Sequence, residues 1–228
     1  EFLKLFFLGF TGCCICSIFP YIAGKTTTIL NMSLIYTSSP IFIVLLSAFF
    51  YKEKINILQS LGFLFCFIGV LIVISNGQLS ALLNLEFATG DIWMIGAAIS
   101  WALYSVYLLN WKSKFDFFTR FALITFCGSL SLFPFYLYEI FFLGIETSLN
   151  TMSIFWILFA AVSPGLIAFT LYAKTQRYLG ASITGFTLYL FLVYGAFYGI
   201  FFFKEKLYMS HYLGAVLVLL GVYFAKKN

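Results

Sequence analysis

Polar and aromatic side chains recur at helical spacing on apolar segments of this chain. Residues three or four apart share one face of a helix, and polar groups inside a bilayer are costly and usually face the interior of a helix bundle. Such faces could line a cavity for a small organic solute, and the alternative is hydrogen bonding between helices. The candidate cavity residues on these faces are Asn31, Tyr36, Ser39, Trp101, Tyr104, Thr187, Tyr189 and Tyr194.

Two prolines interrupt apolar segments near these residues. Pro40 lies in the middle of one segment, and Pro164 follows Ser163 in another. Proline removes a backbone hydrogen bond and kinks a helix, and within a membrane such a break is tolerated where it borders a cavity or where neighbours satisfy the backbone. We therefore expect Pro40, Ser163 and Pro164 to border the same cavity, although transmembrane prolines are also common without such a role.

Titratable groups suited to catalysis are scarce in the apolar segments. No acidic or basic residue falls in the middle of an expected helix, and the single histidine, His211, is expected to anchor the start of the last helix at the membrane interface. Cys13 and Cys16 have CxxC spacing without a second pair or a histidine cluster, so we interpret them as small buried apolar side chains. The sequence predicts no catalytic residue, no metal, no cofactor and no proton relay, and it disfavours an enzyme.

The composition requires a membrane setting for these residues. The chain has 228 residues, of which 63% are hydrophobic and 9% are charged, whereas soluble domains carry about 25% charged residues. We expect an all-α integral membrane protein, because about 20 apolar residues cross the hydrocarbon core as a helix. Eight segments qualify, at roughly 3–23, 27–51, 57–75, 92–110, 118–142, 153–173, 181–203 and 209–225.

One stretch of the sequence occurs twice. Phe49–Asn76 and Phe201–Asn228 align without a gap at an offset of 152 residues, and each contains KEK followed by glycines seven residues apart. Small residues let helices approach closely in lipid. The glycines are therefore expected to form a packing groove on the last helix of each copy, and they are Gly62, Gly69, Gly214 and Gly221.

The offset also predicts how the chain is organised. The first repeat would occupy residues 1–76 and the second 91–228, with 77–90 as the connecting loop. Subtracting 152 from Ser153 gives Glu1, so we expect the first repeat to lack two helices that the second repeat has. The complete architecture would be an inverted repeat of five-helix units, with eight of ten transmembrane helices present, because an odd number of helices per unit reverses the orientation of the second copy.

The basic residues predict the orientation in the membrane. With the C-terminus inside, alternate loops hold ten basic residues on the cytoplasmic side and three on the outer side, and Asp91 falls in an outer loop. Cytoplasmic loops are enriched in Lys and Arg. The net charge of +5 is therefore interpreted as a topology signal rather than as a sign of nucleic-acid binding.

Several motifs resemble the EamA family of the drug/metabolite transporter superfamily. They are SLIYTSSPIF at 33–42 with the KEK turn that follows, GDIWMIGAAISWALYSVYLLN at 90–110, and the segment from 180 to the second KEK with LGAVLVLLGVYFAK after it. The resemblance implies ten helices in two inverted five-helix repeats and the movement of small metabolites through a central cavity. The chain departs from the family in lacking the first two helices and in having Leu192 where the family has a proline matching Pro40.

Together these patterns predict a multi-pass transporter of the cell (inner) membrane with a cytoplasmic C-terminus. It would carry small organic metabolites, amino-acid-like, nucleotide-like or drug-like, by alternating access. Its expected partners are the small-molecule substrate and the lipid bilayer, without nucleic acid and with a homodimer as one arrangement. The alternative is a non-transporting membrane protein or a truncated remnant of a transporter gene.

Overall fold

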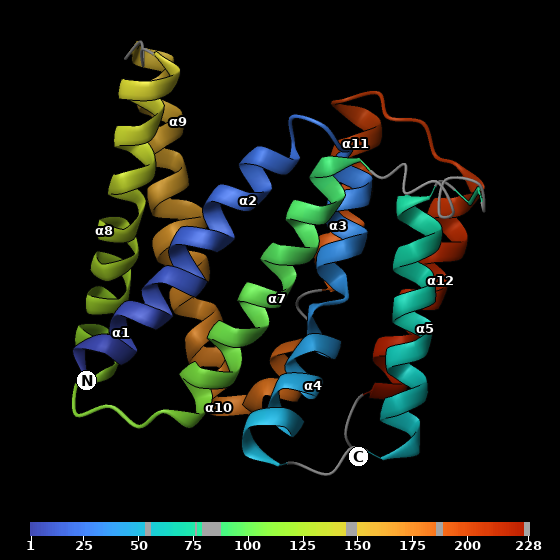
Figure 1. The fold of residues 1–228 in the computed structure, drawn as a ribbon, viewed down its shortest axis with the longest axis horizontal. Coiled ribbons are helices and arrows are strands. Elements are labelled where there is room, and N and C mark those ends of the chain that lie inside the picture. The colour runs from blue at the N-terminus through green and yellow to red at the C-terminus, as the bar shows by residue number, and fades with distance from the viewer. Residues whose placement is uncertain (53–55, 76, 79–87, 145–149, 186–188, 226–228) are drawn as a thin grey trace.

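A computed structural model of the chain describes residues 1–52, 56–75, 77–78, 88–144, 150–185 and 189–225, and every regular element in these ranges is a helix (Figure 1). The all-α prediction is confirmed for this part of the chain. The elements, with η denoting a π-helix, are α1 (Phe2–Gly9), η1 (Phe10–Ile15), α2 (Cys16–Ala23), α3 (Ile29–Thr37), α4 (Ser39–Tyr51), α5 (Ile57–Ile74), α7 (Thr89–Asn110), α8 (Phe117–Leu143), α9 (Thr151–Ala160), η2 (Ala161–Ala168), α10 (Phe169–Gly185), α11 (Tyr189–Phe201) and α12 (Met209–Ala225).

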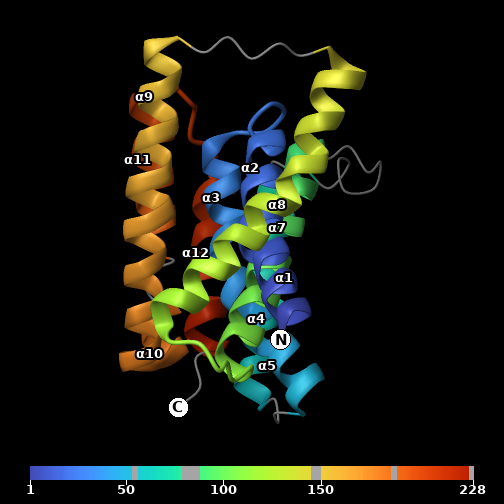
Figure 2. The same cartoon turned by 90° about the vertical axis from the view of Figure 1, so that its left-hand side faces the viewer.

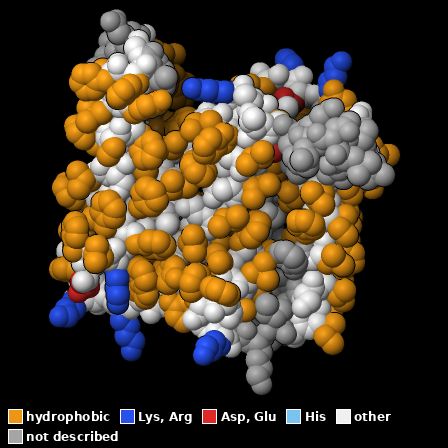
Figure 3. Space-filling model, viewed as in Figure 1, with side chains coloured by type: hydrophobic (Ala, Val, Ile, Leu, Met, Phe, Trp, Pro, Cys, Tyr) orange, Lys and Arg blue, Asp and Glu red, His pale blue; other side chains and the backbone are white. Residues whose placement is uncertain are grey.

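The lengths and surfaces of the helices are those of a multi-pass membrane protein. Five described spans are long and apolar enough to cross a bilayer, and they are Phe2–Ala23, Ile29–Tyr51, Thr89–Asn110, Phe117–Phe142 and Thr151–Thr175. Ser60–Val73 and Met209–Gly221 are shorter apolar helices. Hydrophobic side chains cover the middle of the face in Figure 3, and Lys and Arg lie at its two ends, as expected for a slab of hydrocarbon between two aqueous layers. The count of eight membrane helices remains a prediction.

Helix α7 lies at the centre of the bundle. It packs against the continuous rod α1–η1–α2 on one side and against α3 and α4 on the other (Figure 1). Three alanines on it, Ala97, Ala98 and Ala102, are fully buried, because small side chains let neighbouring helices approach closely in lipid. In Figure 2, the rod α9–η2–α10 stands on one side of the molecule and α8 leans across another.

The two helices that carry the repeated glycines form the most extensive pair in the fold, α5 against α12. A Cβ added to Gly69 would lie 3.0 Å from the carbonyl oxygen of Gly214, and one added to Gly221 would lie 2.5 Å from the carbonyl oxygen of Gly62. Later positions on one helix therefore face earlier positions on the other, and the two helices run antiparallel. The absence of side chains at these positions is what allows the backbones to touch.

The helix that carries Pro40 is broken. Helix α3 ends at Thr37 and α4 begins at Ser39, with Pro40 in the first turn of α4, where its missing N–H costs least. The Ser39 hydroxyl donates to the carbonyl of Tyr36 across this break. Pro164 lies within the π-helical segment η2, and π-helical turns are a usual consequence of a residue that does not fit the α-helical ladder.

Two local features recur at the spacing of the sequence repeat. Lys52 and Lys204 are the non-glycine residues with positive φ in the described part of the chain, at 54° and 56°. Segment η2 begins at Ala161, and η1 begins at Phe10, one residue away from the 152-residue offset. A left-handed non-glycine residue costs about 1–2 kcal/mol, so the same cost is carried at the end of α4 and again just after α11.

Candidate functional site

An aromatic cluster lies where α3, α7 and α10 meet, and Trp101 on α7 is its centre. Its ring centroid lies 6.3 Å from that of Tyr36 on α3 and 5.3 Å from that of Tyr104, one turn further along α7. Phe169 and Tyr172 of α10 lie on another side, at 5.7 Å and 5.2 Å. Trp101 and Tyr104 are only 6% and 2% exposed. The structure thus brings together three of the residues predicted to line a cavity, Tyr36, Trp101 and Tyr104.

The rod α1–η1–α2 packs against this cluster. A Cβ at Gly12 would lie 2.4 Å from the ring of Tyr104, so only glycine allows the ring to lie on the backbone of η1. The Ser100 hydroxyl donates to the carbonyl of Thr11 at 2.9 Å. This bond joins α7 to η1.

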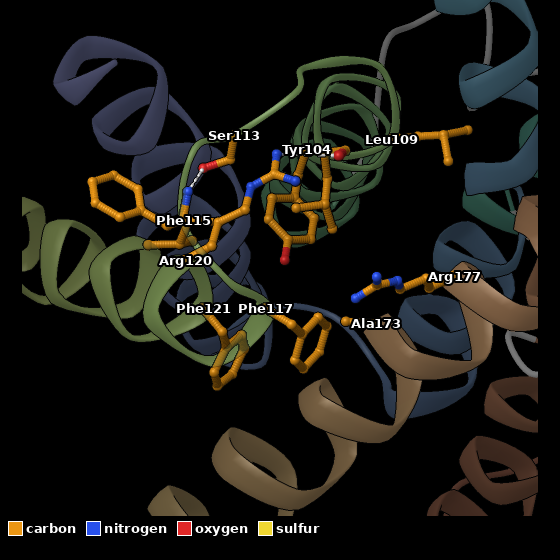
Figure 4. A pocket seen from close by; sticks show the side chains of 11 residues that line it. Tyr104, Leu109, Ser113, Phe115, Phe117, Arg120, Phe121, Ala173 and Arg177 are labelled. Carbon is orange, nitrogen blue, oxygen red and sulfur yellow. Dashed lines mark hydrogen bonds between the residues drawn. The ribbon is translucent and has the colours of Figure 1, made fainter.

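A pocket of about 330 Å³ opens beside the cluster, between the end of α7, the start of α8 and α10 (Figure 4). Tyr104 belongs to both the aromatic cluster and the pocket, since its ring contacts Trp101 and also forms part of the pocket wall. The walls are mainly apolar and aromatic, which is typical of sites for small molecules. The lining residues are Tyr104, Leu108, Leu109, Ser113, Phe115, Phe117, Arg120, Phe121, Ile124, Ala173 and Arg177.

Two arginines extend into this pocket from opposite sides, Arg120 from α8 and Arg177 from α10 (Figure 4). The Nη2 atom of Arg120 donates to the carbonyls of Leu108 and Trp111, at 3.2 Å and 3.0 Å, so it caps the end of α7 as cations do at helix C-termini. The Nε of Arg120 is buried and has no hydrogen-bond partner among the described residues. None of the lining residues is acidic.

A second polar group lies away from the pocket and joins three helices through Asn31 of α3. The backbone N–H of Tyr208 donates to His211 Nδ1 at 3.0 Å, so the proton of the neutral imidazole is on Nε2. His211 Nε2 donates to Asn31 Oδ1 at 3.1 Å. Asn31 Nδ2 donates in turn to the Asp91 carboxylate, at 3.4 Å and 3.5 Å, and the Thr27 hydroxyl also donates to that carboxylate. We call Thr27, Asn31, Asp91 and His211 the polar junction.

The structure gives two members of the polar junction partners that the sequence did not predict. His211 was expected at the membrane interface as an anchor and Asp91 in an outer loop. His211 is only 5% exposed, in the first turn of α12, and Asp91 is 1% exposed, in the first turn of α7. His211 is buried because Asn31, 180 residues away in the sequence, offers an acceptor that no local pattern reveals.

Glu205, in the second KEK tripeptide, also binds at long range. Its carboxylate accepts hydrogen bonds from the backbone N–H groups of Ile29 and Leu30, at 2.7 Å and 3.1 Å. These groups are the unpaired donors at the start of α3, where a negative charge is favourable. A Cβ at Gly199 would lie 2.6 Å from the same carboxylate. The tripeptide therefore serves helix capping in this copy.

The other predicted cavity residues are distributed over the fold. Asn31 belongs to the polar junction, and Ser39 is buried beside the break before Pro40. Ser163 is half-buried in η2, which also contains Pro164. Tyr189 begins α11, and Tyr194 on the same helix is 58% exposed and is not brought to the cluster. Thr187 lies outside the described residues.

Sequence reasoning missed the members of the site that come from α8 and α10. Phe169 and Tyr172 are spaced by three, as Trp101 and Tyr104 are, and that spacing could have indicated a second aromatic face. Arg120 and Arg177 were counted as cytoplasmic charges, and nothing in their local sequence indicates that they share a pocket.

The sequence of this chain is similar to those of transporters. The profile of the EamA-like transporter family matches residues 1–75 and 88–226. An uncharacterized transporter of Archaeoglobus fulgidus is 26% identical over 227 residues, which is 98% of this chain and 75% of that protein. One from Methanothermobacter thermautotrophicus is 25% identical over 202 residues, 89% of this chain and 58% of that protein. A third, YdfC of Bacillus subtilis, is 26% identical over 82% of this chain, and the chain spans 58% of its length.

Proposed function

The chain belongs to the EamA-like transporter family, and on this premise we propose that it moves a small organic solute across a cell membrane by alternating access. The observation that carries the proposal is the aromatic cluster around Trp101, which is built from three helices and borders a pocket through Tyr104. Aromatic rings supply apolar area and polar tips at once. Such a lining suits amino-acid-like, nucleotide-like or drug-like solutes.

We further propose that residues 1–76 and 91–228 are two inverted repeats and that 77–90 connects them. Three observations support this arrangement. Lys52 and Lys204 share a left-handed conformation at the repeat offset. Helices α5 and α12 run antiparallel, and the Cys66 thiol donates to the carbonyl of Val218, its equivalent 152 residues later, at 3.2 Å. Equivalent residues contact each other where a two-fold axis passes between inverted units.

The breaks in the helices suggest where the protein bends during transport. The α3–α4 break lies between Tyr36 and Pro40, directly beside the cluster, and η1 and η2 lie on its other sides. Kinks and π-helical turns are the usual places where long helices bend. We propose that these segments open and close the cavity alternately to the two sides of the cell (inner) membrane, with the C-terminus in the cytoplasm.

The test is solute flux through the full-length protein in proteoliposomes, with a panel of labelled amino acids, nucleotides and amphipathic drugs. Trp101→Ala is expected to lower the flux of the transported solute by about tenfold or more, since it removes ring contacts with four aromatic side chains, each worth about 0.5–1.5 kcal/mol beyond its buried area. The matched control is Trp156→Ala, because Trp156 on α9 is 55% exposed and belongs to no part of the site.

Folding of both variants is checked by gel filtration in detergent, and Trp101→Phe retains an aromatic ring if the alanine variant does not fold. Correctly folded protein that carries no solute of the panel would refute the proposal and would favour a non-transporting membrane protein. Equal flux in Trp101→Ala and Trp156→Ala would refute the cluster as the cavity wall.

A further inference from the structure

The pocket beside the aromatic cluster carries charge of one sign. Arg120 and Arg177 reach into it from α8 and α10, and in Figure 4 the Arg177 side chain extends toward the hydroxyl of Tyr104. Each guanidinium is a planar fork of donors that matches a carboxylate or a phosphate. These are the two arginines of the chain, and both line this one pocket.

We propose that this pocket binds the anionic group of the transported solute, a carboxylate or a phosphate, and that the aromatic cluster receives the apolar body of the same molecule. The inference rests on the proposed transport function and assigns its substrate class, an aromatic or apolar organic anion. Tyr104 connects the two parts, since its ring lies at 5.3 Å from that of Trp101 and its side chain lines the pocket.

The walls of the pocket strengthen an interaction with an anion. Phe115, Phe117 and Phe121 line it together with leucines, and apolar walls lower the effective dielectric constant, which increases the attraction between opposite charges. The same walls increase the repulsion between the two guanidinium groups when no anion lies between them. An anion that contacts both removes this repulsion.

The simpler reading is that both arginines have structural or topological roles. Arg120 does cap α7, but the bonds to Leu108 and Trp111 use only Nη2, and the buried Nε is left without a partner among the described residues. Arg177 fits the excess of basic residues on the cytoplasmic side. That rule accounts for its presence at this end of the helix and does not account for its approach to Tyr104.

Two nearby carboxylates, those of Glu1 and Asp116, accept other hydrogen bonds and do not line the pocket. Glu1 is close enough to act on Arg120 electrostatically, but its carboxylate accepts hydrogen bonds from the Ser113 hydroxyl and the Lys114 backbone N–H, at 2.8 Å and 2.9 Å. Asp116 accepts from the first backbone N–H groups of α8. The residues that line the pocket carry two guanidinium groups and no carboxylate.

The experiment measures anion binding directly and does not depend on flux. The full-length protein is placed in phosphatidylcholine nanodiscs, and benzoate and phenyl phosphate are titrated while intrinsic tryptophan fluorescence is followed, with benzamide as the neutral analogue. We expect the two anions to bind at least about tenfold more tightly than benzamide, since a hydrogen bond to a charged group is stronger than a neutral one. Arg177→Gln should remove that preference, and added salt should weaken it.

The control is Lys112→Gln, which removes the same charge from an exposed residue at the same end of the molecule, outside the lining. It should bind the anions as the parent does. Arg177 is exposed and caps no helix among the described residues, so its replacement should leave the gel-filtration profile unchanged. Arg120→Lys keeps the charge without the fork and is expected to weaken binding by a smaller factor.

A lipid headgroup offers the same chemistry as a solute, and nanodiscs with phosphatidylglycerol separate the two. Binding of phosphatidylglycerol at the pocket would overturn the assignment to a solute if neither benzoate nor phenyl phosphate binds in nanodiscs without that lipid. Equal affinity for benzamide and benzoate, or equal loss in Lys112→Gln and Arg177→Gln, would also overturn it. Anion binding without flux of any solute would instead refute the transport function and leave the pocket standing. Flux without anion preference would refute this inference alone.

Discussion

Replacing Asn31 by alanine removes the side chain that joins α3 to both α7 and α12. The change leaves the His211 Nε2–H without its acceptor and the Asp91 carboxylate without one of its donors. Each unsatisfied buried partner costs about 1–3 kcal/mol, and more when it is charged. We therefore expect Asn31→Ala to lower the free energy of unfolding by about 2–6 kcal/mol.

A smaller loss is expected if these bonds behave like average bonds between membrane helices. Such bonds contribute about 0.6 kcal/mol each, because polar groups also find partners in the unfolded chain within the membrane. Two of them would give only about 1.2 kcal/mol. The structure favours the larger value, since Asn31, Asp91 and His211 are all nearly inaccessible to solvent.

Thermal unfolding of the detergent-solubilised protein separates the two values. For a chain of this length, 1 kcal/mol corresponds to a shift of about 2–4 °C in Tm, so a loss of 2 kcal/mol lowers Tm by roughly 4–8 °C. The matched control is Asn110→Ala, because Asn110 is exposed and its amide donates only to Val106 of its own helix.

A Tm for Asn31→Ala within about 1 °C of that for Asn110→Ala would contradict the reasoning. Coupling to His211 is the second readout. Because the two residues share one hydrogen bond, the combined Asn31→Ala and His211→Ala protein should lose less stability than the sum of the single losses. Strict additivity would show that the bond between them contributes nothing.

Three further predictions concern helix packing and helix ends. Gly214→Val should destabilise the protein by about 1–3 kcal/mol in thermal unfolding, since a Cβ there would lie 2.2 Å from a methyl group of the facing valine on α5. The control is Gly24→Ala, which should be neutral because a Cβ there would lie 3.4 Å from its nearest neighbour. Lys204→Gly should raise stability by about 0.5–1 kcal/mol, because glycine takes the φ of 56° without strain, and an unchanged or lower Tm would contradict this. Asp116 caps α8, and hydrogen bonds, that from Thr119 foremost, lower the pKa of its carboxyl. The cap is therefore present at neutral pH and is lost as pH falls through the folded-state pKa, so Asp116→Ala should be less stable than the parent at neutral pH and equal to it in strong acid, while Asp116→Asn should keep its cap at both.

The sequence by itself determined the membrane class, the helical content and the family. These properties depend on composition, on runs of apolar residues and on local motifs, all of which can be read along the chain. The spacing of Trp101 and Tyr104 likewise placed both on one face of a helix, because three residues make nearly one turn. Tyr36 was found in the same way, from its place on a polar face of another segment.

Only the tertiary structure decided which of these faces meet. Phe169 and Tyr172 lie on Trp101 because α10 passes beside α7, and Arg120 and Arg177 share a pocket although 57 residues separate them. Asp91 and His211 are joined through Asn31, which lies between them and bonds to both. A partner's position depends on how helices far apart in sequence pack together, and the local sequence around each residue carries no record of it.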